Sequence, residues 1–111
     1  SVLLDGKPVA SCATFAWQAD GADICTIEGL AAPDGTLDPV QQAFVDNSAF
    51  QCGYCTPGMI VLARALLDHD PNPDRASIRN WMGANICRCT GYEMIIEAVE
   101  KAASMVRAEV E

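Results

Sequence analysis

Four cysteines in two close pairs are the residues of this chain best suited to chemistry. Cys52 and Cys55 are spaced C-x2-C, and after a gap of thirty-one residues Cys87 and Cys89 are spaced C-x-C. The short spacings let each pair bind a metal through one local turn, whereas the long gap indicates that the two turns come from different parts of the fold. Such an all-sulfur ligand set suits an iron–sulfur cluster or a structural zinc ion.

The choice between the two metals decides the class of function. The C-x2-C spacing is common to both, but the C-x-C arm has no histidine near it and so modestly favours an iron–sulfur cluster. A cluster would make the chain an electron carrier, either within a larger complex or as a free-standing ferredoxin. Zinc would make it a structural, zinc-binding interaction domain, and this alternative stays open on spacing alone.

Composition excludes other classes of function. The chain has 111 residues, enough for one domain, and its net charge of −8 comes with only seven basic residues, which are scattered singly. The absence of a basic stripe argues against nucleic-acid binding. The longest apolar run, residues 59–63, is too short to span a membrane. The cysteine spacing is unlike that of a secreted disulfide scaffold, which favours a reducing cytoplasm and leaves a periplasmic location open.

The sequence predicts an extended region followed by helices. Within residues 1–30 we expect a hairpin that turns at Asp5-Gly6 and a strand over residues 23–27, where polar and apolar residues alternate. A loop over residues 29–37, which contains two glycines and a proline, is the expected boundary between two regions.

Four helices are predicted after that loop, and together they would form a small bundle. The expected starts and ends are marked by capping residues and prolines: Asp38-Pro39 with Gln41 to about Ser48, Thr56-Pro57 to Leu67, Asn72-Pro73 to about Ala84, and a capping box at Thr90-Gly91-Tyr92-Glu93 for the last helix. Both cysteine pairs come just before a predicted helix start, where backbone N–H groups can partly neutralise anionic sulfur.

Beyond the spacing, the residues around the cysteines carry a family resemblance. Residues 51–59 read QCGYCTPGM and residues 85–92 read NICRCTGY. These two motifs closely resemble the iron–sulfur subunit of the xanthine oxidase family, the molybdenum hydroxylases. Residues 4–12, 26–30 and 39–44 also look like the family, so the resemblance extends over nearly the whole chain.

The resemblance implies an α+β fold with two parts. Residues 1–30 would be the C-terminal remainder of a plant-ferredoxin-like β domain, truncated in this chain, and residues 31–111 would be a four-helix 2Fe–2S-binding domain. It further implies that Cys52, Cys55, Cys87 and Cys89 ligate a 2Fe–2S cluster. Gln51 and Cys89 match positions that touch the pterin of the molybdenum cofactor.

The resemblance also implies a second cluster that this sequence cannot complete. Cys12 looks like the fourth ligand of that cluster, and three further cysteines spaced C-x4-C-x2-C would come immediately before Ser1. We therefore expect one complete cluster site in this chain and a second if such an upstream segment is present. Cys25 matches no ligand position and reads as a small buried hydrophobic residue.

The function implied is that of an electron-transfer subunit without catalytic residues of its own. A large partner subunit would bind the molybdenum–pterin cofactor, and a medium subunit would bind FAD. Single electrons would pass from molybdenum through the cluster of this chain to the second cluster and then to the flavin.

Overall fold

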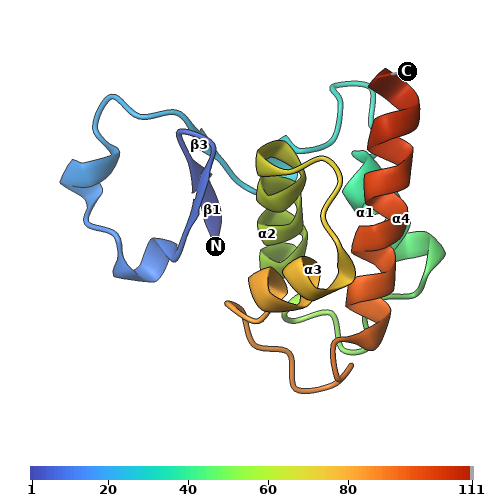
Figure 1. Cartoon of the computed structure of the whole chain (residues 1–111). Coiled ribbons are helices and arrows are strands. Elements are labelled where there is room, and N and C mark those ends of the chain that lie inside the picture. The colour runs from blue at the N-terminus through green and yellow to red at the C-terminus, as the bar shows by residue number, and fades with distance from the viewer. Residues whose placement is uncertain (111) are drawn as a thin grey trace.

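The computed structural model describes residues 1–110 and has a small sheet beside a group of helices (Figure 1), which confirms the predicted α+β class. The sheet holds three strands in the order β2-β1-β3. The strands are β1 (Val2–Leu4), β2 (Lys7–Val9) and β3 (Ile24–Cys25), and the α-helices are α1 (Pro39–Asp46), α2 (Thr56–His69), α3 (Arg75–Met82) and α4 (Glu93–Val110).

The hairpin predicted at Asp5-Gly6 is present. β1 and β2 pair antiparallel, with Leu4 opposite Lys7. Asp5 and Gly6 have φ angles of 50° and 81°, and positive φ at both central residues is what a type I′ hairpin turn requires. β3 pairs antiparallel with the other edge of β1, with Leu3 opposite Cys25.

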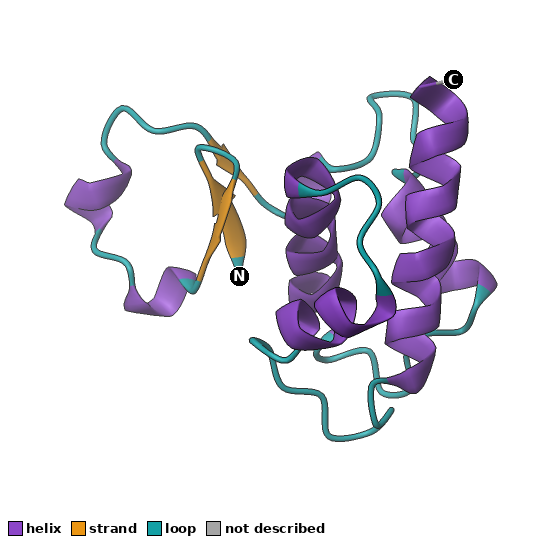
Figure 2. Ribbon diagram, in the orientation of Figure 1, coloured by secondary structure: helices purple, strands orange, loops and turns teal. Residues whose placement is uncertain are grey.

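The prediction that the first thirty residues are mainly extended is wrong. Three short 3-10 helices lie there, η1 (Ser11–Ala13), η2 (Ala16–Ala19) and η3 (Ile27–Gly29), and β3 is two residues long instead of five. The Gln18 side chain accepts a hydrogen bond from the Phe15 N–H at 2.8 Å, so a local contact fixes the backbone of η2 in place of strand pairing. η1 and η2 occupy the long loop beyond the sheet (Figure 2).

Two of the four predicted helix starts are observed, α1 at Pro39 and α2 at Thr56. At α1 the Asp38 carboxylate accepts the Val40 N–H at 2.9 Å, and the Gln41 side chain accepts the Asp38 N–H at 2.9 Å, which together form a capping box. The sequence predicts the start of α3 near Pro73, but the helix begins at Arg75. Asp74 takes the N-cap role because its carboxylate accepts the Ser77 N–H at 2.7 Å.

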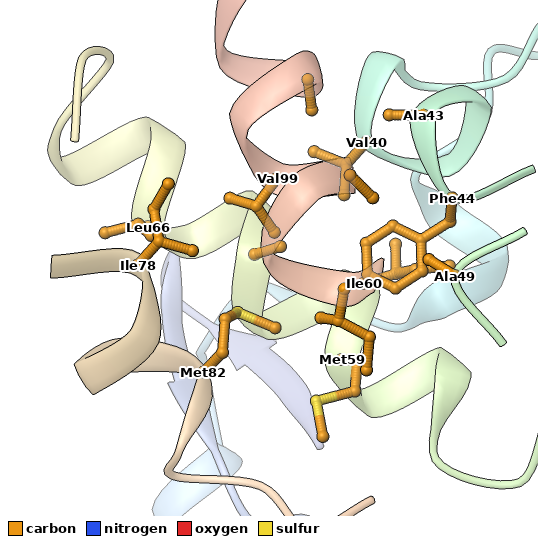
Figure 3. Close-up of a cluster of buried hydrophobic side chains, with 14 of the residues drawn as sticks. Val40, Ala43, Phe44, Ala49, Met59, Ile60, Leu66, Ile78, Met82 and Val99 are labelled. Carbon is orange, nitrogen blue, oxygen red and sulfur yellow. The ribbon is translucent and has the colours of Figure 1, made fainter. Parts of the chain in front are cut away.

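The helices form a closed four-helix bundle, since α1 contacts α2 and α4, and α3 contacts the same two helices. Their buried side chains meet in one core, part of which is drawn in Figure 3; its largest members include Phe44, Met59, Ile78, Met82 and Ile95. The sheet attaches to this bundle through Leu3, which packs against Val61 and Ala65 of α2. In residues 1–110 we find no helix long and apolar enough to cross a membrane.

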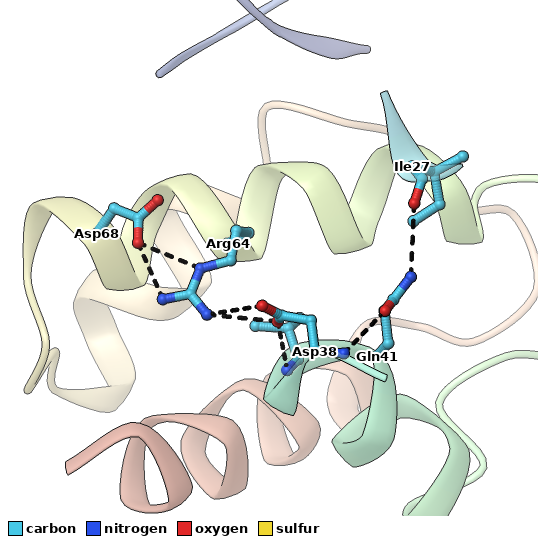
Figure 4. A network of polar contacts seen from close by, with 6 residues as sticks. Ile27, Asp38, Gln41, Arg64 and Asp68 are labelled. Carbon is cyan, nitrogen blue, oxygen red and sulfur yellow. Dashed lines mark hydrogen bonds and ion pairs between the residues drawn. The ribbon is translucent and has the colours of Figure 1, made fainter. Parts of the chain in front are cut away.

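An arginine of α2 ties α1 to the bundle (Figure 4). The Arg64 guanidinium lies 3.1 Å from the Asp38 carboxylate, which also caps α1, and 2.9 Å from the Asp68 carboxylate. The Arg64 and Asp38 side chains are only 15% and 14% exposed. A pair this sheltered from water is screened less than a surface ion pair.

We expect Arg64→Met to lower the free energy of unfolding by about 1–3 kcal/mol, because it leaves the sheltered Asp38 carboxylate without its cation. Arg79→Met is the matched control. Arg79 is 66% exposed and lies 3.9 Å from Glu93, so its replacement should change the free energy of unfolding by less than about 1 kcal/mol. Equal effects in urea unfolding of the two variants would contradict this assignment.

Candidate metal centre

The two cysteine motifs meet at one end of the bundle. α2 and α4 begin at the same end, and the loops that precede them lie close together there (Figure 1). A cavity of about 320 Å³ opens between the loops. It is lined by all four motif cysteines and by three other loop residues: Cys52, Tyr54, Cys55, Ile86, Cys87, Arg88 and Cys89. Residues more than thirty positions apart in sequence thus form one sulfur-lined site, which we call the cysteine centre.

Within the cysteine centre the sulfurs pair across the motifs. The Sγ atoms of Cys52 and Cys89 are 3.6 Å apart, and the Cys55 and Cys87 thiols lie close enough to shift each other's pKa. The sequence spacing predicts that each motif binds a metal through its own two cysteines; the contact between Cys52 and Cys89 joins the two motifs instead, and which sulfurs share a metal stays a prediction. The two loops face each other, and the Cys52 and Cys89 sulfurs, one from each loop, are in contact.

This pairing is easier to reconcile with a cluster of two irons than with a single zinc ion. A tetrahedral zinc ion with four sulfurs about 2.3 Å away would bring every pair of sulfurs to within about 3.8 Å. Within residues 1–110, however, no three cysteine, histidine, aspartate or glutamate side chains converge enough to hold one metal ion. Two separate sulfur pairs suit two metal ions, each with two cysteine ligands, which is the arrangement of a 2Fe–2S cluster.

Hydrogen bonds aimed at sulfur support a site for anionic ligands. The Tyr54 N–H donates to Cys52 Sγ at 3.5 Å, and the Thr90 N–H donates to Cys87 Sγ at 3.5 Å. The Thr90 hydroxyl donates to the same Cys87 sulfur at 3.1 Å. Gly53 has a φ of 83°, which turns the first loop so that the next N–H faces back toward Cys52. Such donors stabilise thiolate and, through it, a bound metal.

The pKa values of the two inner thiols, Cys55 and Cys87, are shifted in opposite directions. Burial alone would raise the pKa of Cys87, but hydrogen bonds from Thr90, and then from Cys55 and the Cys89 backbone, outweigh burial and lower that pKa to about 7. Burial, followed by the hydrogen bond and the charge interaction with Cys87, raises the pKa of Cys55 to about 11. The thiol of Cys87 is therefore prepared to lose its proton before that of Cys55.

Thr90 has a different role from the one predicted. The sequence pattern predicts that Thr90 and Glu93 form a capping box for the last helix. Instead the Thr90 N–H and hydroxyl both face Cys87, while the Glu93 carboxylate pairs with Arg75. A threonine directly follows the last cysteine in each motif (Cys55-Thr56 and Cys89-Thr90), and that repetition is the one sequence signal that could have indicated a role near sulfur.

Gln51 lies at the edge of the cysteine centre. Its side-chain amide donates to the Cys89 carbonyl at 3.2 Å, so it connects the first motif to the second. Gln51, Cys52 and Cys89 are all exposed, whereas Cys55 and Cys87 are partly buried. The two residues predicted to touch a pterin, Gln51 and Cys89, therefore lie side by side on the outward edge of the site; their pterin contact stays a prediction.

The other two cysteines lie elsewhere. Cys12 is exposed on η1, in the sheet region, and does not line the cavity. Its role as a ligand of a second cluster stays a prediction. Cys25 is partly buried and packs beside Leu3 and the apolar side chains of α2, in keeping with its reading as a small hydrophobic residue.

A family model decides between the two metals that the spacing left open. Residues 26–100 match the family described as the 2Fe-2S binding domain, which is more than half of the chain. The chain belongs to this family. The matched residues take in α1, α2, α3 and the first part of α4, to residue 100, and they contain all four cysteines of the cysteine centre.

Curated relatives of this 2Fe-2S binding domain protein are parts of oxidoreductases. It is 49% identical to the nicotinate dehydrogenase small FeS subunit of Eubacterium barkeri, covering 92% of this chain and 64% of the relative. It is 48% identical to a probable xanthine dehydrogenase subunit of Bacillus subtilis, covering 88% and 56%. These matches confirm the resemblance to iron–sulfur subunits of the xanthine oxidase family.

Solved structures agree with the fold. The chain superposes on the aldehyde oxidoreductase from Desulfovibrio gigas with a TM-score of 0.91 and 46% identity, over 98% of this chain and 12% of that one. For quinoline 2-oxidoreductase from Pseudomonas putida 86 the TM-score is 0.88 at 44% identity, over 96% of this chain and 67% of that one. The chain thus spans between about an eighth and two thirds of these four proteins.

Proposed function

We propose that this chain holds a 2Fe–2S cluster in its cysteine centre and serves as the electron-transfer subunit of a molybdenum hydroxylase. The observation that carries the proposal is the pairing of Cys52 with Cys89 and of Cys55 with Cys87 across one cavity. Membership of the 2Fe-2S binding domain family supports it independently. When bound, the cluster would accept and release one electron at a time.

The protein's part is to position and polarise the four ligands. α2 and α4 bring the two loops together, and N–H groups from both loops stabilise the sulfurs. Cys52 and Cys89 lie on the exposed edge, whereas Cys55 and Cys87 lie on the inner side against the helical core. Electrons would therefore enter through the exposed edge, which Gln51 and Cys89 share and which a cofactor on a partner could approach.

The proposed partners follow from the family. A large subunit would carry the molybdenum–pterin cofactor against Gln51 and Cys89, and a medium subunit would carry FAD. A second cluster, with Cys12 as one ligand, would lie between the cysteine centre and the flavin. Relatives are named for nicotinate, xanthine, aldehyde and quinoline, so an aldehyde or a nitrogen heterocycle is the proposed class of substrate for the whole complex.

Exposed apolar side chains beside the cysteine centre support a partner there. Tyr54 is 93% exposed and Ile86 is 84% exposed, and both line the sulfur cavity. Apolar groups so fully in contact with water around a functional site are typical of a surface that another protein covers.

Gel filtration of the protein purified from its native source tests the proposal. We expect the chain to elute in a large complex together with molybdenum, and the visible absorption of that complex to bleach with dithionite. A small, coloured protein free of molybdenum would instead indicate a free-standing ferredoxin. A colourless protein with bound zinc would contradict electron transfer altogether.

A further inference from the structure

A chain of hydrogen bonds in the second loop ends on one sulfur. The Tyr92 N–H donates to the Thr90 hydroxyl oxygen at 3.1 Å, and the Thr90 hydroxyl donates to Cys87 Sγ at 3.1 Å. The bond from Tyr92 leaves the hydroxyl proton of Thr90 free to point at sulfur. The direction of the donor is thereby fixed by the loop itself.

Tyr92 holds this arrangement in place at some conformational cost. Its φ is 73°, in the left-handed region that residues other than glycine rarely adopt. Its phenolic oxygen donates to the Asn85 carbonyl at 2.9 Å and accepts the Cys87 N–H at 3.0 Å. One side chain thus closes the loop from Asn85 to Tyr92 and fixes the backbone of Cys87. A strained residue held by two such bonds at a functional site points to a requirement for this geometry.

We propose that Thr90, oriented by Tyr92, sets the reduction potential of the centre through its hydroxyl bond to the Cys87 sulfur. The inference rests on the proposed function, since it requires a cluster at the four cysteines. A donor aimed at a ligand sulfur stabilises the reduced form, which carries one more negative charge, more than the oxidised form. Thr90 therefore raises the potential and makes the centre a better acceptor. Tyr92 is a positioning residue, because it acts through Thr90 and through the Cys87 backbone.

The test is a redox titration, followed by EPR, of the iron-loaded protein in wild-type and variant forms. Thr90→Val keeps the shape of the side chain and removes the donor. We expect it to lower the equilibrium constant for reduction of the cluster by up to about tenfold. For a one-electron couple this corresponds to a reduction potential about 59 mV lower. Thr90→Ser keeps a hydroxyl and should restore the wild-type value.

Thr26→Val is the matched control for loss of a threonine hydroxyl. Thr26 donates to the Glu28 carboxylate at 2.6 Å and does not line the sulfur cavity, so its replacement should leave the potential unchanged. A Thr90→Val protein with full iron and sulfide and an unchanged potential would overturn the inference. A lowered potential in Thr26→Val equal to that in Thr90→Val would overturn it too.

Iron and sulfide content separates failure of the inference from failure of the proposed function. If the wild-type protein takes up no iron, the proposed function is contradicted, whatever potentials the variants show. If the Thr90→Val protein takes up little iron, Thr90→Ala replaces it in the titration. The smaller alanine side chain cannot clash with its surroundings, and it removes the same donor, so the reduction potential should fall in the same way. Loss of iron from both variants, with helix content retained, would show that Thr90 is needed for cluster assembly. It would overturn the proposal that Thr90 sets the reduction potential.

Discussion

Replacing Cys87 with alanine is expected to abolish cluster binding at the cysteine centre and to remove the visible absorption of that cluster. Each iron of a 2Fe–2S cluster needs two cysteine sulfurs from the protein, and Cys87 is paired with Cys55 on the inner side of the cavity. The variant also loses the sulfur on which both Thr90 donors converge. Iron and acid-labile sulfide should each fall by about two per chain.

Cys25→Ala is the matched control for this variant. Cys25 is also partly buried, but it packs beside Leu3 in the sheet region and does not line the sulfur cavity. It should keep the wild-type iron, sulfide and visible spectrum. Full iron in Cys87→Ala, or loss of iron in Cys25→Ala, would show that the cysteine centre is not where the cluster binds.

Phe44→Ala should produce a large loss of stability, about 3–5 kcal/mol in the free energy of unfolding. Phe44 of α1 is 1% exposed and lies in the core, near Ile60 and Ala49 (Figure 3). Truncation removes most of a buried ring and leaves a cavity that the close-packed helices can fill only in part. Because the core supports the start of α2, we also expect slower or weaker loading of iron.

Val45→Ala is the control for a change at the neighbouring position of the same helix. Val45 is 54% exposed, so its truncation should change the free energy of unfolding by no more than about 0.5 kcal/mol. Denaturant unfolding of both variants, loaded with iron under the same conditions, measures the difference. A Phe44→Ala protein as stable as Val45→Ala would contradict the assignment of the core.

Local signals of the sequence predicted much of the fold. The hairpin at Asp5-Gly6 and the helix starts at Pro39 and Thr56 depend on turn glycine, capping carboxylate and first-turn proline, all of which act within a few residues. The predicted start of α3 is misplaced because Asn72 and Asp74 are both plausible caps, and the choice falls on Asp74, whose carboxylate reaches the Ser77 N–H.

The candidate site was predictable in its members but not in its internal arrangement. Spacing and surrounding motif identified the four cysteines, which the structure brings to one cavity. The pairing of Cys52 with Cys89 depends on how two loops approach each other, which no local pattern encodes. The sequence pattern assigns Thr90 to a helix cap. A threonine hydroxyl can bond to several kinds of partner, and only the folded loop shows that this one donates to the Cys87 sulfur.

Metal and sulfide analysis of the purified protein, with EPR before and after dithionite, tests the central claim most directly. The cysteine centre predicts about two irons and two sulfides bound at its four cysteines, no zinc, and a signal from that cluster that appears only on reduction. Zinc in place of iron, with no colour and no signal on reduction, would contradict an electron-transfer role for this chain.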